Sequence, residues 1–278
     1  IVHQLIDLAL LQNGMLKGEA LDKFIPHAAI AADKRFTLDT SNGSENCTFN
    51  IPENVIVQNS GKTLRIGKLT GKGELGGFCS FQQNATVKAN TLQVGNDNNF
   101  KFEGIVTSND NFTKMGSGEM TVTGAWNSTG AVNISAGSIR LGTGGSLGTG
   151  SLTVSENAAL TGVSDSKLAL TNSSITINGT VHPGESATST SGNINFGGKN
   201  VTLSKTAKVV IGIRKSASEN SINNSYIKGI GTLKLAAGTT IGAVISKNNL
   251  GKLTTDEAVA DSFYVWTDVK NVNIAGTT

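Results

Sequence analysis

The chain has few aromatic residues, few charges and no long hydrophobic run. Aromatic residues make up 5% of its 278 positions, and charged residues make up 15%. So few large rings favour an aliphatic and narrow core. No stretch approaches the roughly 18–20 apolar residues of a membrane-spanning helix, so the sequence predicts no membrane span.

Basic residues are not clustered either. The formal net charge is +3, and no basic cluster is denser than Lys34–Arg35. A nucleic-acid surface needs clustered Lys and Arg, so we expect no nucleic-acid partner. Low charge with much Gly, Ser, Thr and Asn is also typical of disorder, but disordered chains lack regularly placed aliphatic residues. Here Val, Ile and Leu recur throughout, which favours a folded chain.

What the chain does have is a repeated pattern of short strands. From Phe36 onward, and most clearly over residues 111–154, β-formers alternate with polar residues and are followed by Gly, Asn or Ser. This pattern predicts short strands joined by tight turns. We therefore expect residues 36–278 to form one β domain.

The first 35 residues follow a different pattern. Apolar residues recur at helical spacing at Val2, Leu5, Ile6, Ala9 and Leu10. Gly14 and Pro26 are candidate helix ends. The sequence predicts a short helical N-terminal cap over residues 1–35, because the end of a β-stack needs cover. A remnant of a preceding domain and a partner-binding helix are the alternatives.

Aliphatic residues also recur with a long period. Two rows of aliphatic residues step by about twenty residues, which is typical of a repeat architecture. The first row is Val122, Leu141, Leu160, Val181 and Val201, and the second row is Ile134, Val154, Ile175 and Ile194. Three short strands and three corners use about that many residues, at roughly 3.3 Å per strand residue. We therefore predict a right-handed parallel β-helix. An antiparallel β-sandwich is the alternative, because it also contains many short strands.

Several segments resemble the autotransporter-associated β-strand repeat of bacterial secreted passengers. They are Phe102–Val106, Asn111–Gly124, Asn127–Gly130, Val132–Gly137, and the strand and glycine-rich turn at 145–154. The resemblance implies export from a bacterium and a parallel β-helix passenger. It implies an adhesive or scaffold role more often than catalysis, and its motif carries no catalytic residue.

Catalysis is the main rival, since parallel β-helices also include polysaccharide lyases and glycoside hydrolases. Between Thr121 and Ala217 the acidic residues are Glu156, Asp165 and Glu185. Paired carboxylates are needed for hydrolysis, and only Asp165 and Glu185 are about one coil apart. The sequence thus predicts no catalytic site, with a carbohydrate-active enzyme as the alternative.

Binding sites are also weakly indicated. Asp97 and Glu103, with neighbouring asparagines, offer the oxygen ligands of Ca²⁺, but a polar corner is the preferred interpretation. Phe263, Tyr264 and Trp266 form either a glycan-stacking platform or a buried cluster. We expect no metal and no cofactor.

The two cysteines, Cys47 and Cys79, are interpreted either as a disulfide of an exported protein or as two independent small residues. Together these patterns predict a secreted or surface-exposed bacterial passenger that acts as a stalk, adhesin or matrix component. Its expected partners are host or environmental glycans or matrix proteins. A pure assembly scaffold without a ligand is a third alternative.

Overall fold

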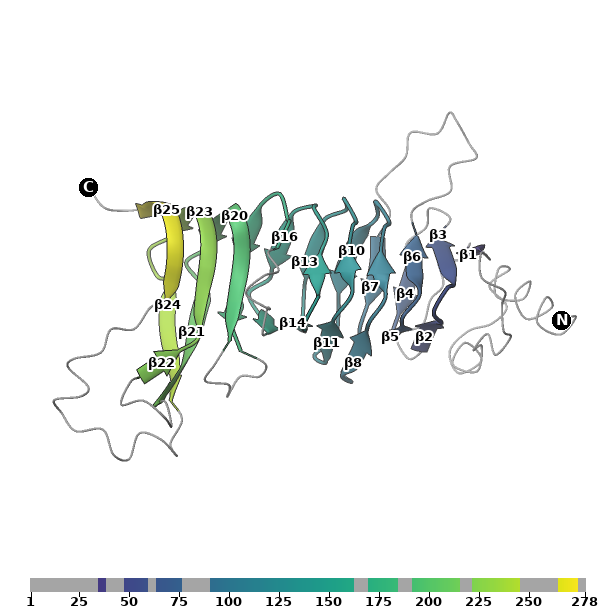
Figure 1. The fold of residues 1–278 in the computed structure, drawn as a ribbon, viewed down its shortest axis with the longest axis horizontal. Coiled ribbons are helices and arrows are strands. Elements are labelled where there is room, and N and C mark those ends of the chain that lie inside the picture. Colours follow the sequence, from purple (N-terminus) through teal and green to yellow (C-terminus); the bar gives the residue numbers. More distant parts are fainter. Residues whose placement is uncertain are drawn as a thin grey trace, which may run out of the picture.

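The computed structural model describes residues 35–38, 48–59, 64–76, 91–162, 170–184, 192–215, 222–245 and 265–274. These residues form 25 strands and contain no helix. Figure 1 shows the strands side by side along the long axis of the molecule. The prediction of a mostly β chain is confirmed. The predicted cap over residues 1–35 lies outside the described residues, apart from Arg35, which begins β1.

The strands form four sheets, which we call A to D. Sheet A contains β1 (Arg35–Leu38), β3 (Ile56–Asn59), β6 (Glu74–Gly76) and β9 (Ile105–Val106), and sheet D contains β12 (Ala125–Trp126) and β15 (Ser146–Leu147). Sheet B contains β2 (Thr48–Ile51), β5 (Lys68–Gly71), β8 (Phe100–Phe102), β11 (Glu119–Val122), β14 (Gly137–Leu141), β17 (Ala158–Gly162), β19 (Thr180–His182), β21 (Lys208–Lys215), β22 (Ile222–Asn224) and β24 (Thr240–Ile245). Sheet C contains β4 (Leu64–Ile66), β7 (Thr91–Val94), β10 (Asn111–Lys114), β13 (Val132–Ile134), β16 (Leu152–Val154), β18 (Ile175–Ile177), β20 (Asn193–Leu203), β23 (Tyr226–Leu235) and β25 (Trp266–Ile274).

The chain enters these sheets in rotation. β2 lies in sheet B, β3 in sheet A, β4 in sheet C and β5 in sheet B again, and we call one such passage a coil. Pairs of described strands are parallel except β21 with β22, which is antiparallel. The described strands therefore do not form an antiparallel sandwich. Long parallel sheets entered in rotation are compatible with a solenoid such as a β-helix.

Successive coils are joined by hydrogen bonds over a near-constant sequence separation. The main-chain nitrogen of Met115 donates to the Val94 carbonyl at 2.7 Å, and that of Ser155 donates to the Ile134 carbonyl at 2.9 Å. Side chains continue the pattern, because the Thr129 hydroxyl donates to Asn109 Oδ1, 20 residues earlier, at 2.6 Å. The predicted step of about twenty residues is confirmed in this part of the chain.

The core consists of inward rows that continue from coil to coil. In sheet C one row holds Leu92, Phe112, Val132, Leu152 and Ile175, all buried. Burying each large aliphatic side chain stabilises the fold by roughly 1.5–3 kcal/mol. Within the described residues, the mainly aliphatic core also contains an aromatic cluster. The Trp126 ring lies edge-on to the Phe112 ring, with ring centroids 4.8 Å apart, and to the Phe102 ring, with ring centroids 6.4 Å apart.

The two predicted rows are partly wrong. Val122 lies opposite Leu141, Leu160 opposite Val181, and Ile134 opposite Val154, as expected. However, Leu160 lies opposite Ile139, and Val154 lies opposite Ile177, so two steps are displaced by two residues. A shift of two keeps a side chain on the same face of a strand, and the apolar pattern does not distinguish the two registers.

The last step of each row fails for a different reason. Val201 lies in sheet C opposite Ile175, and Ile194 lies opposite Ile227. Beyond β19 the coils become longer, and Lys208 lies opposite Thr240. The 11-residue strand β20 bends at Gly197 and Gly198, both with positive φ, where its register with β23 shifts. A uniform coil length is therefore wrong for the C-terminal part.

Candidate functional site

The outer side of sheet C carries a row of small polar residues. Between the inward rows, one residue of each strand points away from the core, and these residues lie opposite one another in register. We call this row the threonine face; it consists of Gln93, Thr113, Asn133, Thr153, Thr176 and Thr202. The row forms because each strand alternates aliphatic and polar residues, and β-branched threonine suits a pleated surface. Each of its side chains is half-buried.

The columns on either side of the threonine face are uncharged as well. They contain mainly Ser and Asn: Asn111, Ala131, Ser151, Ser174 and Asn200 on one side, and Ser135, Ser155, Asn178 and Ser204 on the other. Charged side chains join the central row only at its ends, where Arg65 lies opposite Gln93 and Lys234 lies opposite Thr202. The centre of sheet C therefore presents a neutral polar surface over the six strands β7, β10, β13, β16, β18 and β20.

Only part of this surface uses its hydrogen-bonding capacity internally. Asn133 donates from Nδ2 to the Ser135 hydroxyl at 3.0 Å, and the Ser155 hydroxyl donates to Asn133 Oδ1 at 3.3 Å. Within the described part of the chain, the hydroxyls of Thr153, Thr176 and Thr202 make no such bond. These three hydroxyls are available to water or to a ligand.

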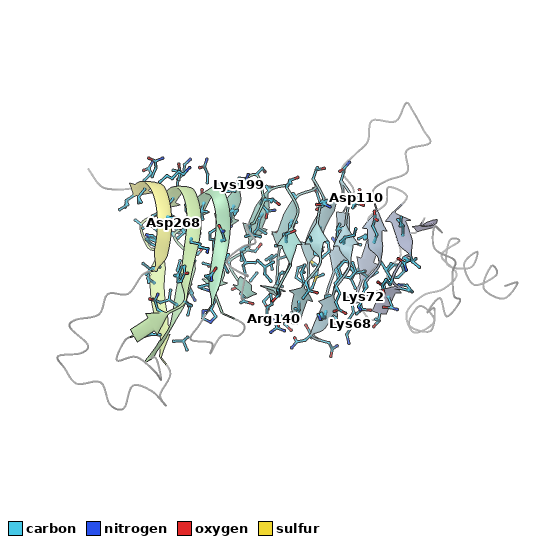
Figure 2. The ribbon with its side chains drawn as sticks, in the orientation of Figure 1. Lys68, Lys72, Asp110, Arg140, Lys199 and Asp268 are labelled. Atoms are coloured by element: carbon cyan, nitrogen blue, oxygen red, sulfur yellow. The ribbon has the colours of Figure 1, made fainter. Side chains whose placement is uncertain are left out.

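The outer side of sheet B is charged instead. Lys101 pairs with Glu103 at 2.8 Å, and Arg140 Nε pairs with Glu119 at 3.0 Å and also donates to the Thr121 hydroxyl at 3.2 Å. The hydrogen bond and charge of Lys101 hold the pKa of Glu103 below its ordinary value. Figure 2 shows Lys68, Lys72 and Arg140 along one long edge of the stack, with Asp110 and Lys199 on the opposite edge. The opposite charges of the Lys101–Glu103 and Arg140–Glu119 pairs largely compensate each other.

A lysine is buried inside the stack. Lys114 is fully buried, and its Nζ donates to the carbonyl oxygens of Met115 at 2.7 Å, Gly116 at 3.0 Å and Ala136 at 3.4 Å. Burial lowers the pKa of the Lys114 ammonium to about 8; Arg65 acts in the same direction, whereas Asp97 and Glu119 oppose the shift. An ammonium held by carbonyls at a corner is a structural contact, because solvent does not reach it.

The asparagine-rich corner after β7 joins two coils. Asp97 Oδ1 accepts hydrogen bonds from the Ser117 hydroxyl at 2.7 Å and main chain at 3.1 Å, which hold the pKa of Asp97 below its ordinary value. Asn99 Oδ1 accepts from the main chain of Glu119 at 2.8 Å. Within the described ranges, no three His, Cys, Asp or Glu side chains group as metal ligands. The geometry thus supports the polar-corner interpretation of Asp97.

One histidine and one threonine are buried on neighbouring strands of sheet B. Thr161 lies opposite His182, and His182 Nδ1 lies 2.7 Å from the Val210 carbonyl, so Nδ1 carries a proton. His182 Nε2 and the Thr161 hydroxyl have no hydrogen-bond partner in the described structure. His182 is 2% exposed and Thr161 is 8% exposed, so both residues are buried.

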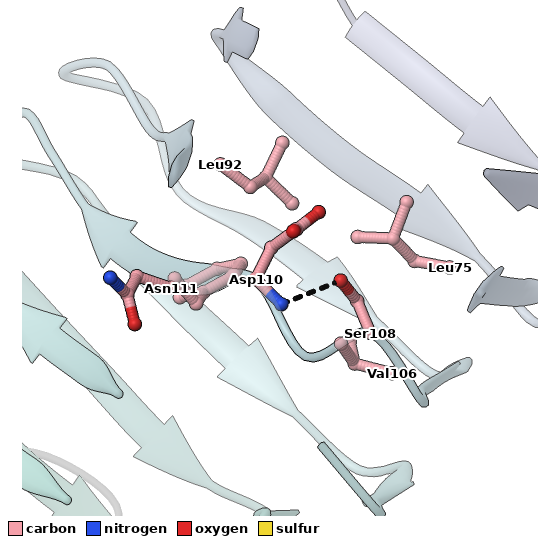
Figure 3. A pocket seen from close by; sticks show the side chains of 7 residues that line it. Leu75, Leu92, Val106, Ser108, Asp110 and Asn111 are labelled. Carbon is pink, nitrogen blue, oxygen red and sulfur yellow. Dashed lines mark hydrogen bonds between the residues drawn. The ribbon is translucent and has the colours of Figure 1, made fainter. Parts of the chain in front are cut away.

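An apolar hollow lies at one corner of the stack. It measures about 260 Å³ including the solvent at its mouth, and Figure 3 shows Ser108 beside Asp110, whose main chain donates to the Ser108 hydroxyl at 2.9 Å. The other lining residues are Leu75, Leu92, Val106, Asn111 and Phe112, of which Figure 3 labels the first four. Asp110 is the one acidic residue of the lining, so the hollow does not bring two carboxylates together.

Most of the residues singled out from the sequence lie outside the described part of the chain. Glu156 lies on an exposed turn, and Asp165 and Glu185 lie outside the described residues. Cys47 and Cys79, and the aromatic residues Phe263 and Tyr264, also lie outside them. Trp266 lies in β25 opposite Ile227 and packs, half-buried, against the core. A stacking platform formed by all three aromatic residues stays a prediction.

Stacked Asn or Thr ladders between coils are plausible from the sequence, but the position of the threonine face was not predicted, although the chain contains a signal for it. Three segments share the order polar, aliphatic, Thr, aliphatic, polar: SLTVS at 151–155, SITIN at 174–178 and NVTLS at 200–204. The period of about twenty residues is visible in the aliphatic residues of these segments, and the threonine between them follows the same order.

Comparison with family models, with curated proteins and with solved structures finds no match to this chain. The likeness to the autotransporter-associated repeat therefore stays a resemblance between residues. Within the described residues, the structure contains no helix that is long and apolar enough to cross a membrane.

Proposed function

We propose that this chain is a right-handed parallel β-helix of the passenger type, secreted or displayed on a bacterial surface. It acts as a stalk, adhesin or matrix component and carries no catalytic site. The right-handed sense follows from the strong preference for right-handed crossovers between parallel strands.

The observation that carries the proposal is the constant register between coils. Over β7, β10, β13 and β16, each strand lies directly opposite the next, and the aliphatic rows continue through all of them. Each added coil lengthens the stack by about 4.8 Å without widening it. Such a structure is suited to separating its two ends and to presenting long flat faces.

The resemblance gives the proposed location and role. The resembling segments between residues 102 and 154 form strands β8 to β16, the most regular part of the stack. In that family such coils belong to exported passengers with adhesive or scaffold roles. Glycans or matrix proteins are therefore the proposed partners.

Small-angle X-ray scattering on the purified chain tests the shape. Nine strands of sheet C span roughly 40 Å at about 4.8 Å per step, so we expect an elongated particle that is wider at its C-terminal coils. Surface labelling of intact cells expressing the native gene tests the location. A spherical particle, or a chain found in the cytoplasm, would contradict the proposal.

A further inference from the structure

We propose that the threonine face binds a neutral, linear polysaccharide that lies along the axis of the stack. This inference rests on the proposed adhesive function and names its surface and its class of ligand. The threonine face is distinct from the charged outer side of sheet B and from the apolar hollow.

The hydroxyls of the threonine face are regularly spaced. Thr153 lies opposite Thr176, which lies opposite Thr202. Adjacent strands of a sheet are about 4.8 Å apart, so these hydroxyls repeat at that interval along the axis. A polymer with a repeated unit can make the same kind of contact at each coil, whereas a compact ligand reaches only one or two.

The hydroxyls of the threonine face also have the hydrogen-bonding chemistry that a sugar needs. A threonine hydroxyl is both a donor and an acceptor, which matches the hydroxyls of a sugar. The hydroxyls of Thr153, Thr176 and Thr202 have no bond within the described structure that a ligand would have to break. Threonine is also stiff at χ1, so little side-chain freedom is lost on binding.

The distribution of charge favours a neutral ligand. The threonine face and its flanking columns hold no ionised side chain between Arg65 and Lys234. An anionic polymer would find no cation over the central coils, while a neutral one has no charge to desolvate there. The paired charges of Lys101 and Arg140 lie on the other sheet.

The flatness of the surface sets the dependence on ligand length. A face without a cleft cannot enclose a sugar ring, so a single ring binds weakly. Once one sugar unit of a polymer is bound, its neighbouring units are held at a high effective concentration next to the face. The affinity of the polymer therefore rises steeply with the number of sugar units. We expect no measurable binding of monosaccharides and at least about tenfold tighter binding when the chain length is doubled to cover the face.

The test uses a pair of matched variants and a set of defined probes. Thr153→Val with Thr176→Val removes two hydroxyls from the threonine face and keeps β-branched side chains. The control, Thr180→Val with Thr240→Val, makes the same change on the outer side of sheet B, where both residues flank Lys208. The probes are neutral glucans, mannans and galactans of graded length, with alginate as the anionic polymer, measured by calorimetry.

The inference predicts that a neutral polymer binds and that the Thr153→Val, Thr176→Val variant loses at least about tenfold in affinity, with the control unchanged. Equal loss in both variants, no loss in either, or binding of alginate alone would overturn it. Failure of every neutral polymer to bind would also overturn it. The scattering and labelling experiments test the stalk independently, so the two failures are distinguishable.

Discussion

Lys114 lies directly opposite Ile134 in neighbouring parallel strands, so a charged side chain occupies a position that is aliphatic in the next coil. Val94, in the preceding coil, is aliphatic as well. The lysine keeps this place because its ammonium reaches three corner carbonyls. The core therefore contains one cation that hydrogen bonds hold and that no carboxylate pairs at salt-bridge distance among the described residues.

Because Lys114 is buried, the free energy of unfolding is expected to change with pH in the alkaline range. The pKa of Lys114 falls from 10.5 to about 8 in the folded chain. Between these values the unfolded chain binds a proton that the folded chain does not, so the contribution of Lys114 to stability increases as the pH rises. We expect a gain of about 2 kcal/mol between pH 7.5 and 9.5 relative to Lys114→Met, measured by urea unfolding. Parallel pH curves for the two proteins would show that this assignment is wrong.

At pH 7, two substitutions of Lys114 separate packing from hydrogen bonding. Lys114→Met fills the same space and removes the buried charge, but leaves the corner carbonyls without a donor. These effects oppose each other, so we expect a change of less than about 1 kcal/mol in the free energy of unfolding. Lys114→Ala also leaves a cavity and is expected to cost roughly 2–4 kcal/mol. Equal losses for both variants would exclude this explanation.

The close approach of coils at Gly124 predicts a larger effect from a smaller change. A Cβ at Gly124 would lie 1.7 Å from the Gly104 carbonyl oxygen, far inside van der Waals contact. Gly124→Ala must therefore separate two coils, and we expect a loss of more than about 3 kcal/mol. Gly242→Ala is the matched control, since its nearest neighbour is a Val210 methyl at 3.9 Å. Thermal unfolding of both variants measures the difference, and similar melting temperatures would refute the stacking at Gly124.

The sequence predicted the strand pattern well where one rule held for many residues. Ile134 and Val154 were placed opposite each other because both belong to coils with corners of the same length. Val201 was misplaced because the segment between His182 and Asn193 lengthens its coil, and no local pattern fixes which sheet the next strand joins. Corner length is a tertiary property, whereas alternation is local.

Side chains that break the alternation were beyond sequence reasoning for a related reason. Lys114 occupies an inward position of a strand whose other inward residue, Phe112, is apolar. From the sequence, a lysine at position 114 is predicted to face solvent, because charged residues are rarely buried. Only the positions of the Met115, Gly116 and Ala136 carbonyls explain its place.

The absence of a catalytic role is also testable. If the chain is a carbohydrate-active enzyme, Glu119, the one acidic residue in the described strands of sheet B, is a candidate carboxylate, and Arg140 pairs with it at 3.0 Å. We expect no release of reducing ends or unsaturated sugars from a panel of polysaccharides, and therefore no difference between the wild type and Glu119→Gln. Turnover that disappears in Glu119→Gln, or on replacing Asp165 or Glu185, would favour the enzyme.

Disulfide trapping tests the parallel register of the stack most directly. Thr153 and Thr176 lie opposite each other on adjacent parallel strands, within the Cα separation of roughly 4.4–6.8 Å that a disulfide spans. Thr153→Cys with Thr176→Cys should form a cross-link under mild oxidation, identified by peptide mapping, whereas Thr153→Cys with Thr180→Cys, which joins different sheets, should not. A cross-link in the second pair and none in the first would contradict the stack of parallel coils.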